Sequence, residues 1–150
     1  MEVGFNYRMT DIQAAVGLVQ LTRLATVVAE RRRLAARYRE LLADVDGVIT
    51  PADPPHGTSN FQSYQVRLAP EVPVERNQVL ESLASEGISA RRGIMAAHLE
   101  PAWAEHPHAE LAVTEEITRR SLILPLWHGL GPADQDRVVT ALRRAVSGTR

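Results

Sequence analysis

Several polar residues that could do chemistry lie in the second half of this 150-residue chain. His98, His106 and His108 suggest a metal site, but no carboxylate lies at a convincing spacing, so we expect none. All 17 basic residues are arginines, and the chain contains no lysine. Because a guanidinium stays protonated and is not nucleophilic, no side chain here can hold a carbonyl compound as a Schiff base.

Two groups of arginines allow a structural or a functional interpretation. Arg91 and Arg92 could face a pocket together with Glu100, or an ion pair at the end of a strand could explain all three. Residues 31–33 lie between Glu30 and Glu40, and i,i+3 and i,i+4 charge pairs are common on helices. We therefore expect residues 31–33 to form a solvated helix face.

Composition and charge narrow the class of protein. The hydrophobic fraction of 45% fits a soluble globular protein. Because the net charge is only −1, no long-range electrostatic field attracts nucleic acid or an anionic membrane. There is no cysteine, no secretory leader, and no apolar run that approaches the roughly 20 residues needed to span a bilayer. These features predict a cytoplasmic protein whose residues 1–150 form a single domain, with neither nucleic acid nor membrane as a partner.

One long helix is expected over about residues 10–45. Thr10 and Gln13 have the spacing of a capping box, and apolar residues recur at near-helical spacing up to Leu42. Such a helix, which could be bent, would reach roughly 45–50 Å, beyond the ~30 Å diameter of a small domain. Part of it must therefore pack on another domain or subunit, unless a break near residues 24–26 folds it back.

The remainder, about residues 46–150, mixes strands and helices. Strands are expected at 62–68, where Tyr64, Val66 and Leu68 share one face, at 88–92 and at 122–124. Helices are expected from Pro73 to about Glu86, over about 110–120, and from 131 to near the C-terminus. This order predicts an α+β fold with a small antiparallel sheet covered by helices.

The stretch from Gly4 to Leu21, taken with the long helix, resembles the segment that follows the cofactor-binding domain in DegT/StrS-type sugar aminotransferases. Residues 63–68, residues 87–101 and residues 121–126 keep the family's order, so the resemblance covers essentially the whole chain. It implies the C-terminal small domain of a fold-type-I aminotransferase with its connecting helix. The implied reaction uses pyridoxal phosphate to transfer an amino group from glutamate to a keto-sugar nucleotide.

The resemblance also implies roles for two residues before the helix. Asn6 matches an asparagine that reaches the cofactor phosphate of the neighbouring subunit in a dimer, and an amide can donate to a phosphate oxygen. Arg8 matches an arginine that contacts the substrate or a carboxylate, where a bidentate guanidinium would suit glutamate. The alternative is that Asn6 and Arg8 only cap and brace the start of the helix.

His98 is the third residue with an implied role. It lies in a segment that borders the substrate pocket in the family, where an imidazole could hydrogen-bond a sugar hydroxyl or a nucleotide phosphate. Ala97 precedes it where many relatives carry proline, and a lone loop histidine is more often structural. Substrate binding and a structural role are therefore both open for His98.

What the sequence lacks limits the implied function. The family's lysine, the ring that stacks on the cofactor and the acid that pairs with its nitrogen belong to a large domain that is absent. We expect the chain not to turn over alone, and to need a lysine-bearing large domain or a partner subunit. Met1 falls just before the motif, which suggests a truncated frame, a split gene or an artificial boundary. The alternative is a non-catalytic remnant or interaction module that binds a partner through its exposed apolar helix.

Overall fold

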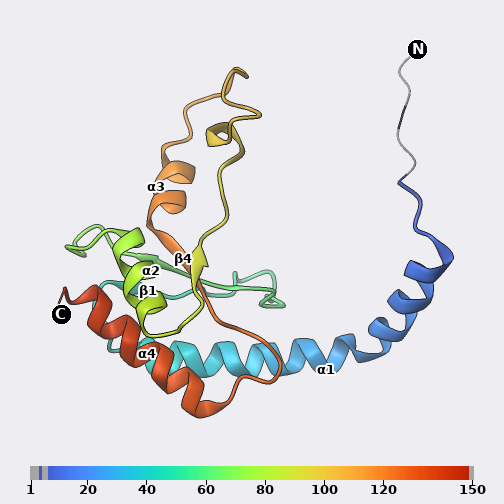
Figure 1. Ribbon diagram of the computed structural model, residues 1–150, viewed down its shortest axis with the longest axis horizontal. Coiled ribbons are helices and arrows are strands. Elements are labelled where there is room, and N and C mark those ends of the chain that lie inside the picture. Colours follow the sequence, from blue (N-terminus) through green and yellow to red (C-terminus); the bar gives the residue numbers. More distant parts are fainter. Residues whose placement is uncertain (1–3, 5–6, 149–150) are drawn as a thin grey trace.

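The structure is a computed structural model that describes residues 4 and 7–148 (Figure 1). The chain begins with helix α1 and then alternates short strands and helices. The elements are α1 (Asp11–Leu42), β1 (Val48–Ile49), β2 (Tyr64–Leu68), α2 (Arg76–Ser85), β3 (Arg91–Arg92), the 3-10 helix η1 (Ala97–Leu99), α3 (Ala112–Arg120), β4 (Ser121–Leu124) and α4 (Pro132–Val146). The predicted α+β class is confirmed.

Helix α1 begins at the predicted capping box. The Gln13 amide donates to the Thr10 hydroxyl at 3.3 Å, and the Thr10 amide donates to the Gln13 side-chain oxygen at 2.9 Å. The helix runs unbroken for 32 residues, so the break near residues 24–26 does not form. Figure 1 shows it bending within its N-terminal half, where the Thr22 hydroxyl donates to the Val19 carbonyl, a contact that bends helices.

The described strands form one antiparallel sheet in the order β1-β2-β4-β3. Tyr64, Val66 and Leu68 point to one face of β2 and are buried against side chains of α1, α2 and α4, as their alternation predicts. Arg67 points to the opposite face, where its guanidinium lies 3.2 Å from the Glu116 carboxylate. Helix α3 therefore lies on the face away from the main core.

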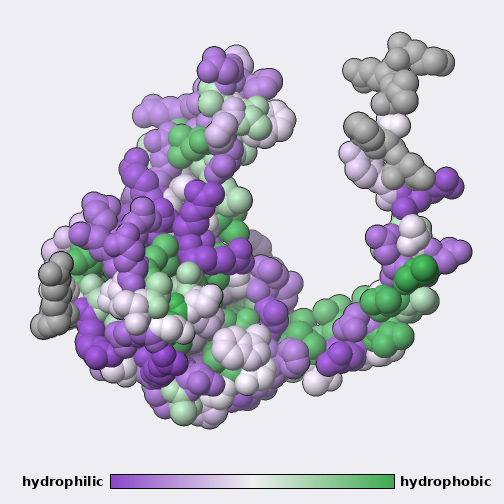
Figure 2. Space-filling view, viewed as in Figure 1, coloured by the Kyte–Doolittle hydropathy of each residue, from purple (hydrophilic) through white to green (hydrophobic). Residues whose placement is uncertain are grey.

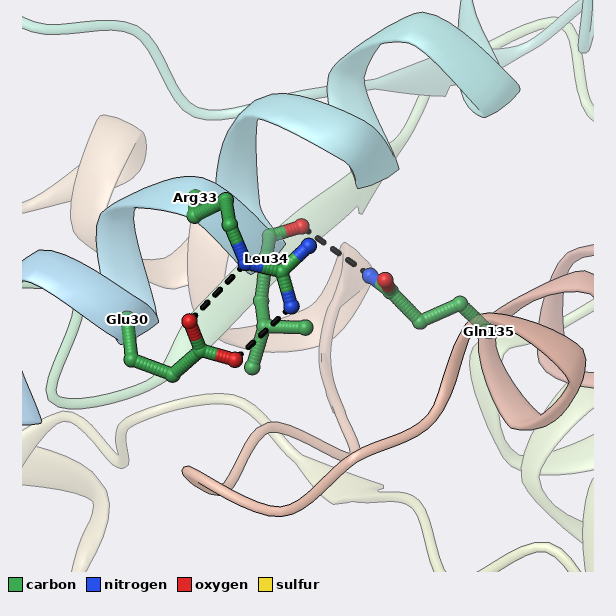
Figure 3. Close-up of polar contacts among 4 residues, drawn as sticks. All are labelled: Glu30, Arg33, Leu34 and Gln135. Carbon is green, nitrogen blue, oxygen red and sulfur yellow. Dashed lines mark hydrogen bonds and ion pairs between the residues drawn. The ribbon is translucent and has the colours of Figure 1, made fainter.

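The C-terminal half of α1 is fixed to the rest of the fold by polar contacts as well as apolar packing. The buried Gln135 side chain of α4 donates to the Leu34 carbonyl at 3.0 Å (Figure 3). Tyr38 stacks on Tyr64 with ring centroids 5.0 Å apart, and its hydroxyl donates to the Pro125 carbonyl at 2.9 Å. These contacts set the direction in which α1 leaves the fold.

The arginine run of α1 departs in part from the prediction. Arg33 makes the expected i,i+3 pair with Glu30 at 2.7 Å, and this hydrogen bond lowers the pKa of the Glu30 carboxyl (Figure 3). Arg31 instead donates to the Phe61 carbonyl at 3.0 Å, and Arg32 binds the same loop. The prediction of a wholly solvated face is therefore wrong for Arg31, which is half-buried, whereas Arg32 binds the loop and stays exposed. The loop carbonyls have no strand partner, and the guanidinium donors satisfy them.

Two predicted boundaries also move, for local reasons. The strand expected at 88–92 shrinks to Arg91–Arg92 because Ile88 still belongs to the end of α2: its amide donates to the Leu83 carbonyl around Gly87, whose φ is +71°. Helix α2 begins at Arg76 and not at Pro73, because Glu75 and Gln78 form a capping box there.

Buried tyrosines make the fold sensitive to alkaline pH. Burial is the main cause that raises the pKa of both Tyr38 and Tyr64 above its ordinary value near 10. A raised folded-state pKa gives stability that is complete below the unfolded pKa and is lost as the pH rises further. We expect the free energy of unfolding to fall above about pH 10, as measured by denaturant titration at a series of pH values.

The two tyrosines should differ on removal of the hydroxyl. The Tyr64 hydroxyl is buried and has no hydrogen-bond partner among the described residues, so Tyr64→Phe should be neutral or stabilising by up to about 1 kcal/mol. Tyr38→Phe, the matched control, loses the bond to Pro125 and should cost about 1 kcal/mol. Equal destabilisation by the two changes would contradict this assignment.

Candidate functional site

The N-terminal half of α1 extends away from the compact part of the chain and presents apolar side chains to solvent (Figure 2). The large exposed side chains on it are Ile12, Val16, Leu18, Val19, Leu21 and Leu24. The expectation that this chain cannot cover its long helix is confirmed, since 32 residues span roughly 48 Å.

Helix α1 also bears on the expectation that no segment could span a membrane. By length and composition it passes the test for a membrane-crossing helix, and the sequence-based statement that no such run exists is wrong. Within Asp11–Leu42, an 18-residue stretch is apolar on average and none of it is buried. A helix that is covered by other protein can have the same length and composition.

We expect the exposed face of α1 to bind a hydrophobic dye or to drive self-association. Replacing Val16, Leu18 and Leu21 by glutamine should reduce dye fluorescence and shift light scattering toward the monomer. The melting temperature should change little, because these side chains lie outside the core. Gln20→Ala on the same helix is the control. A wild-type chain that is monomeric and binds no dye would contradict the expectation of a missing partner.

The motif before α1 lies at the far end of this uncovered helix. Arg8 is exposed and lines an open depression with Tyr7, Met9 and Gln13. Asn6 lies outside the described residues. Thr10 and Gln13 perform the capping of α1, so Arg8 is not needed as the cap.

Residues 93–120 form an arm that leaves the sheet after β3 and returns along α3 to β4. In the view of Figure 1, the arm rises from the top of the compact part, and α1 leaves this part at the right before its N-terminal half bends toward the top. Figure 2 shows open space between them. The described part of the chain therefore presents two projections around a space that it does not fill.

His98 lies inside the arm. Its side chain is 7% exposed, its Nε2 atom lies 3.4 Å from Oε1 of Glu115 in α3, and its ring centroid lies 4.6 Å from that of His108. Glu115 also lies 3.9 Å from Arg119. Within the chain, His98 thus joins η1 to α3. Across the described residues, no group of three or more histidine or acidic side chains is placed to hold a metal.

The base of the arm depends on a close approach of two chain segments. The Gly93 amide donates to the Ser121 carbonyl at 3.0 Å, and a Cβ at Gly93 would lie only 2.1 Å from the Ser121 Oγ atom. Ser121 is fully buried, and its hydroxyl donates to the Ile117 carbonyl at 2.6 Å. Only glycine fits at position 93.

The structure places Arg91 and Arg92 in different surroundings. Arg92 lies 3.8 Å from the Glu100 carboxylate, which is the ion pair at the strand end. Arg91 is paired in register with Ile123 and lines a depression of about 200 Å³. The polar side chains that line it with Arg91 are Gln62, Ser63 and Ser89.

Comparison with known proteins identifies the family to which this fold belongs. Residues 1–143 match the DegT/DnrJ/EryC1/StrS aminotransferase family. The chain belongs to this family. The resemblance drawn from the sequence is confirmed, and the aminotransferases of this family in general depend on pyridoxal phosphate.

Similar proteins include enzymes of nucleotide-sugar metabolism. The chain is 39% identical over 144 residues to the GDP-perosamine synthase of Caulobacter vibrioides, covering 93% of this chain and 38% of that protein. It is 34% identical over 146 residues to the dTDP-4-dehydro-2,3,6-trideoxy-D-glucose 4-aminotransferase of Saccharopolyspora spinosa, covering 97% and 37%. The crystal structure of DesI with its TDP-sugar product superposes with a TM-score of 0.85 at 36% identity, covering 97% and 38%.

The chain spans about two fifths of the length of these relatives and corresponds to their C-terminal portion. The described residues show no enclosed site for pyridoxal phosphate within this chain. There is no lysine, and the described residues around Arg8 line an open depression with exposed side chains, not an enclosed polar cradle. The match to an aminotransferase family favours a helix α1 that is covered by protein.

Sequence reasoning missed two features of this region. It did not single out Gly93 as a packing requirement, and it did not connect Gln62, Ser63 and Ser89 with Arg91. The available signal for the first was a glycine directly after a strand, which often marks a close backbone approach. No local signal existed for the second, because three separate segments meet there.

Proposed function

We propose that this chain is the C-terminal portion of a pyridoxal-phosphate-dependent nucleotide-sugar aminotransferase, which transfers an amino group from glutamate to a keto-sugar nucleotide in the cytoplasm. Residues 1–150 act as a single domain in which α1 is the connecting helix. A lysine-bearing large domain, or a partner subunit of a dimer, completes the site. When bound, the cofactor supplies the electron sink and carries the amino group between the two substrates.

The observation that carries this proposal is the uncovered half of α1 in a chain that belongs to an aminotransferase family. The helix begins directly after the motif that contains Asn6 and Arg8, and it exposes an apolar face that needs protein cover. A chain without lysine can contribute binding groups to such a site but cannot supply the Schiff-base amine.

Three residues have proposed roles in the completed site. Asn6 donates to the cofactor phosphate of the neighbouring subunit, and Arg8 clamps a substrate carboxylate through two parallel hydrogen bonds. His98 contacts the nucleotide-sugar substrate from the arm. Its contact with Glu115 would fix the orientation of the ring for this task.

Asn6→Ala should weaken cofactor retention by the assembled enzyme by about 1–3 kcal/mol, the usual range when a charged group loses a hydrogen bond. Retention can be followed by dialysis of the enzyme and measurement of the cofactor absorbance that remains. Asn77→Ala, which changes an exposed amide on α2, is the matched control. Unchanged retention in Asn6→Ala would remove Asn6 from the site.

The second candidate function is a non-catalytic remnant or interaction module. The same exposed face of α1 would then bind a partner without any cofactor. An assembly that forms through α1 but never retains pyridoxal phosphate would support this function over the first.

A further inference from the structure

We propose that the depression beside β3 binds a diphosphate group through Arg91. The inference rests on the proposed function, because a nucleotide-sugar substrate carries that group. The diphosphate is the most highly charged part of that substrate. The proposal assigns it to residues of this chain other than Asn6, Arg8 and His98.

Three segments that are distant in sequence build the depression. Gln62 and Ser63 come directly before β2, Ser89 comes shortly before β3, and the end of β4 with Pro125 and Leu126 completes the wall. The polar side chains can donate from a guanidinium, two hydroxyls and an amide. No acidic residue is among the lining residues.

Arg91 differs from the arginines near it in having no partner within the part of the chain that the structure describes. Arg92 pairs with Glu100, Arg67 pairs with Glu116, and Arg76 donates to the Thr118 carbonyl at 3.2 Å. A guanidinium without a partner in such a depression suits an anion.

The donor set favours a diphosphate over a carboxylate. One arginine alone satisfies the two oxygens of a carboxylate in a bidentate contact. Here two serine hydroxyls and a glutamine amide line the same depression, and a diphosphate has enough oxygens to accept from all of them. The volume of about 200 Å³ admits this group but not a whole nucleotide sugar, so the rest of the substrate would extend out of the depression.

The position of the depression agrees with this ligand. Arg91 lies two residues before Gly93, where the arm leaves the sheet, so the depression adjoins the base of the arm that carries His98. A substrate held here by its diphosphate could reach toward the open space between the arm and α1 (Figure 2).

The test is an NMR titration of the whole ¹⁵N-labelled chain with inorganic pyrophosphate at constant ionic strength. We expect the backbone amide signals of Ser63, Ser89 and Arg91 to shift. Arg91→Gln should weaken binding at least about tenfold, because a charge-assisted contact is lost. Arg92→Gln is the matched control: it is the neighbouring arginine with its own partner, and it should change the dissociation constant less than about twofold. Both arginines are exposed, so the melting temperature should stay close to that of the wild type.

Three results would overturn the proposal. The first is that no amide signal of the wild type shifts when pyrophosphate is added. The second is that Arg91→Gln and Arg92→Gln weaken pyrophosphate binding equally. The third is that glutamate binds at the same residues as tightly as pyrophosphate. The titration contains neither pyridoxal phosphate nor a lysine-bearing partner. A negative result therefore leaves the proposed aminotransferase function standing, and failure to assemble a cofactor site leaves the titration unaffected.

Discussion

Gln135→Glu is expected to destabilise the chain by about 3–5 kcal/mol at pH 7, because it places an unpaired carboxylate in the core. Gln135 is fully buried, and its Nε2 atom donates to the Leu34 carbonyl at 3.0 Å. An ionised glutamate would turn an oxygen toward that carbonyl and lose the only hydrogen bond of the side chain among the described residues. Helix α4 would lose its polar attachment to α1.

The loss should depend on pH in a defined direction. Burial would raise the pKa of the new carboxyl above its unfolded value near 4.3, so the folded state would bind the proton more tightly than the unfolded state. The destabilisation is therefore full at neutral pH and shrinks as the pH falls through the raised folded pKa. Denaturant unfolding of the variant and the wild type at about pH 5 and pH 8 would measure this difference.

Gln135→Met is the matched control for this prediction. It removes the bond to Leu34 but also removes the Gln135 Oε1 atom, which is buried without a partner among the described residues. The volume is similar, so the cost should stay within about 1.5 kcal/mol and should not vary with pH. If Gln135→Glu and Gln135→Met were equally stable at pH 7, the side chain would not be buried against α1.

Gly93→Ala is expected to cost about 2–3 kcal/mol and to displace the arm. The new methyl group would lie 2.1 Å from Oγ and 2.9 Å from Cβ of Ser121, and the Ser121 side chain is buried and bonded to the Ile117 carbonyl. Gly57→Ala is the control, because its nearest contact would be an ordinary 3.6 Å to Pro54. Thermal or denaturant unfolding of both variants gives the comparison.

A second substitution separates steric conflict from loss of glycine flexibility. In a Ser121→Gly background the two closest contacts are gone, so Gly93→Ala should cost less than about 1 kcal/mol. The coupling between the two positions, taken from the double-mutant cycle, should therefore be at least about 1–2 kcal/mol in favour of the double variant. Additive effects would mean that the chain does not close on Ser121 at the base of the arm.

The sequence predicted the elements whose signals are local. The Thr10–Gln13 capping box, the alternation of Tyr64, Val66 and Leu68, and the glycine stop at Gly87 each act through neighbouring residues, and each appears in the structure. The excess length of α1 also followed from one residue count and the rise of a helix.

Features that join distant segments could not be predicted in this way. Arg31 bonds to a carbonyl 30 residues away, and Gln135 bonds to one 101 residues away. The depression at Arg91 needs the register of β3 on β4 before its lining can be known. For the candidate site, the motif and its family could be recognised, whereas the contacts of His98 with Glu115 and His108 depend on how the arm folds back.

The most direct test of the central claim is the absorbance spectrum of the purified chain with pyridoxal phosphate, first alone and then with a lysine-bearing large domain of the family. The proposed function predicts no band of lysine-bound cofactor from this chain alone, because it has no lysine. In the mixture, the band should be retained after dialysis and bleached by glutamate, and Asn6→Ala should weaken its retention. A mixture that forms a stable complex yet neither retains the cofactor better than the large domain alone nor responds to glutamate would contradict the claim that this chain completes an aminotransferase site.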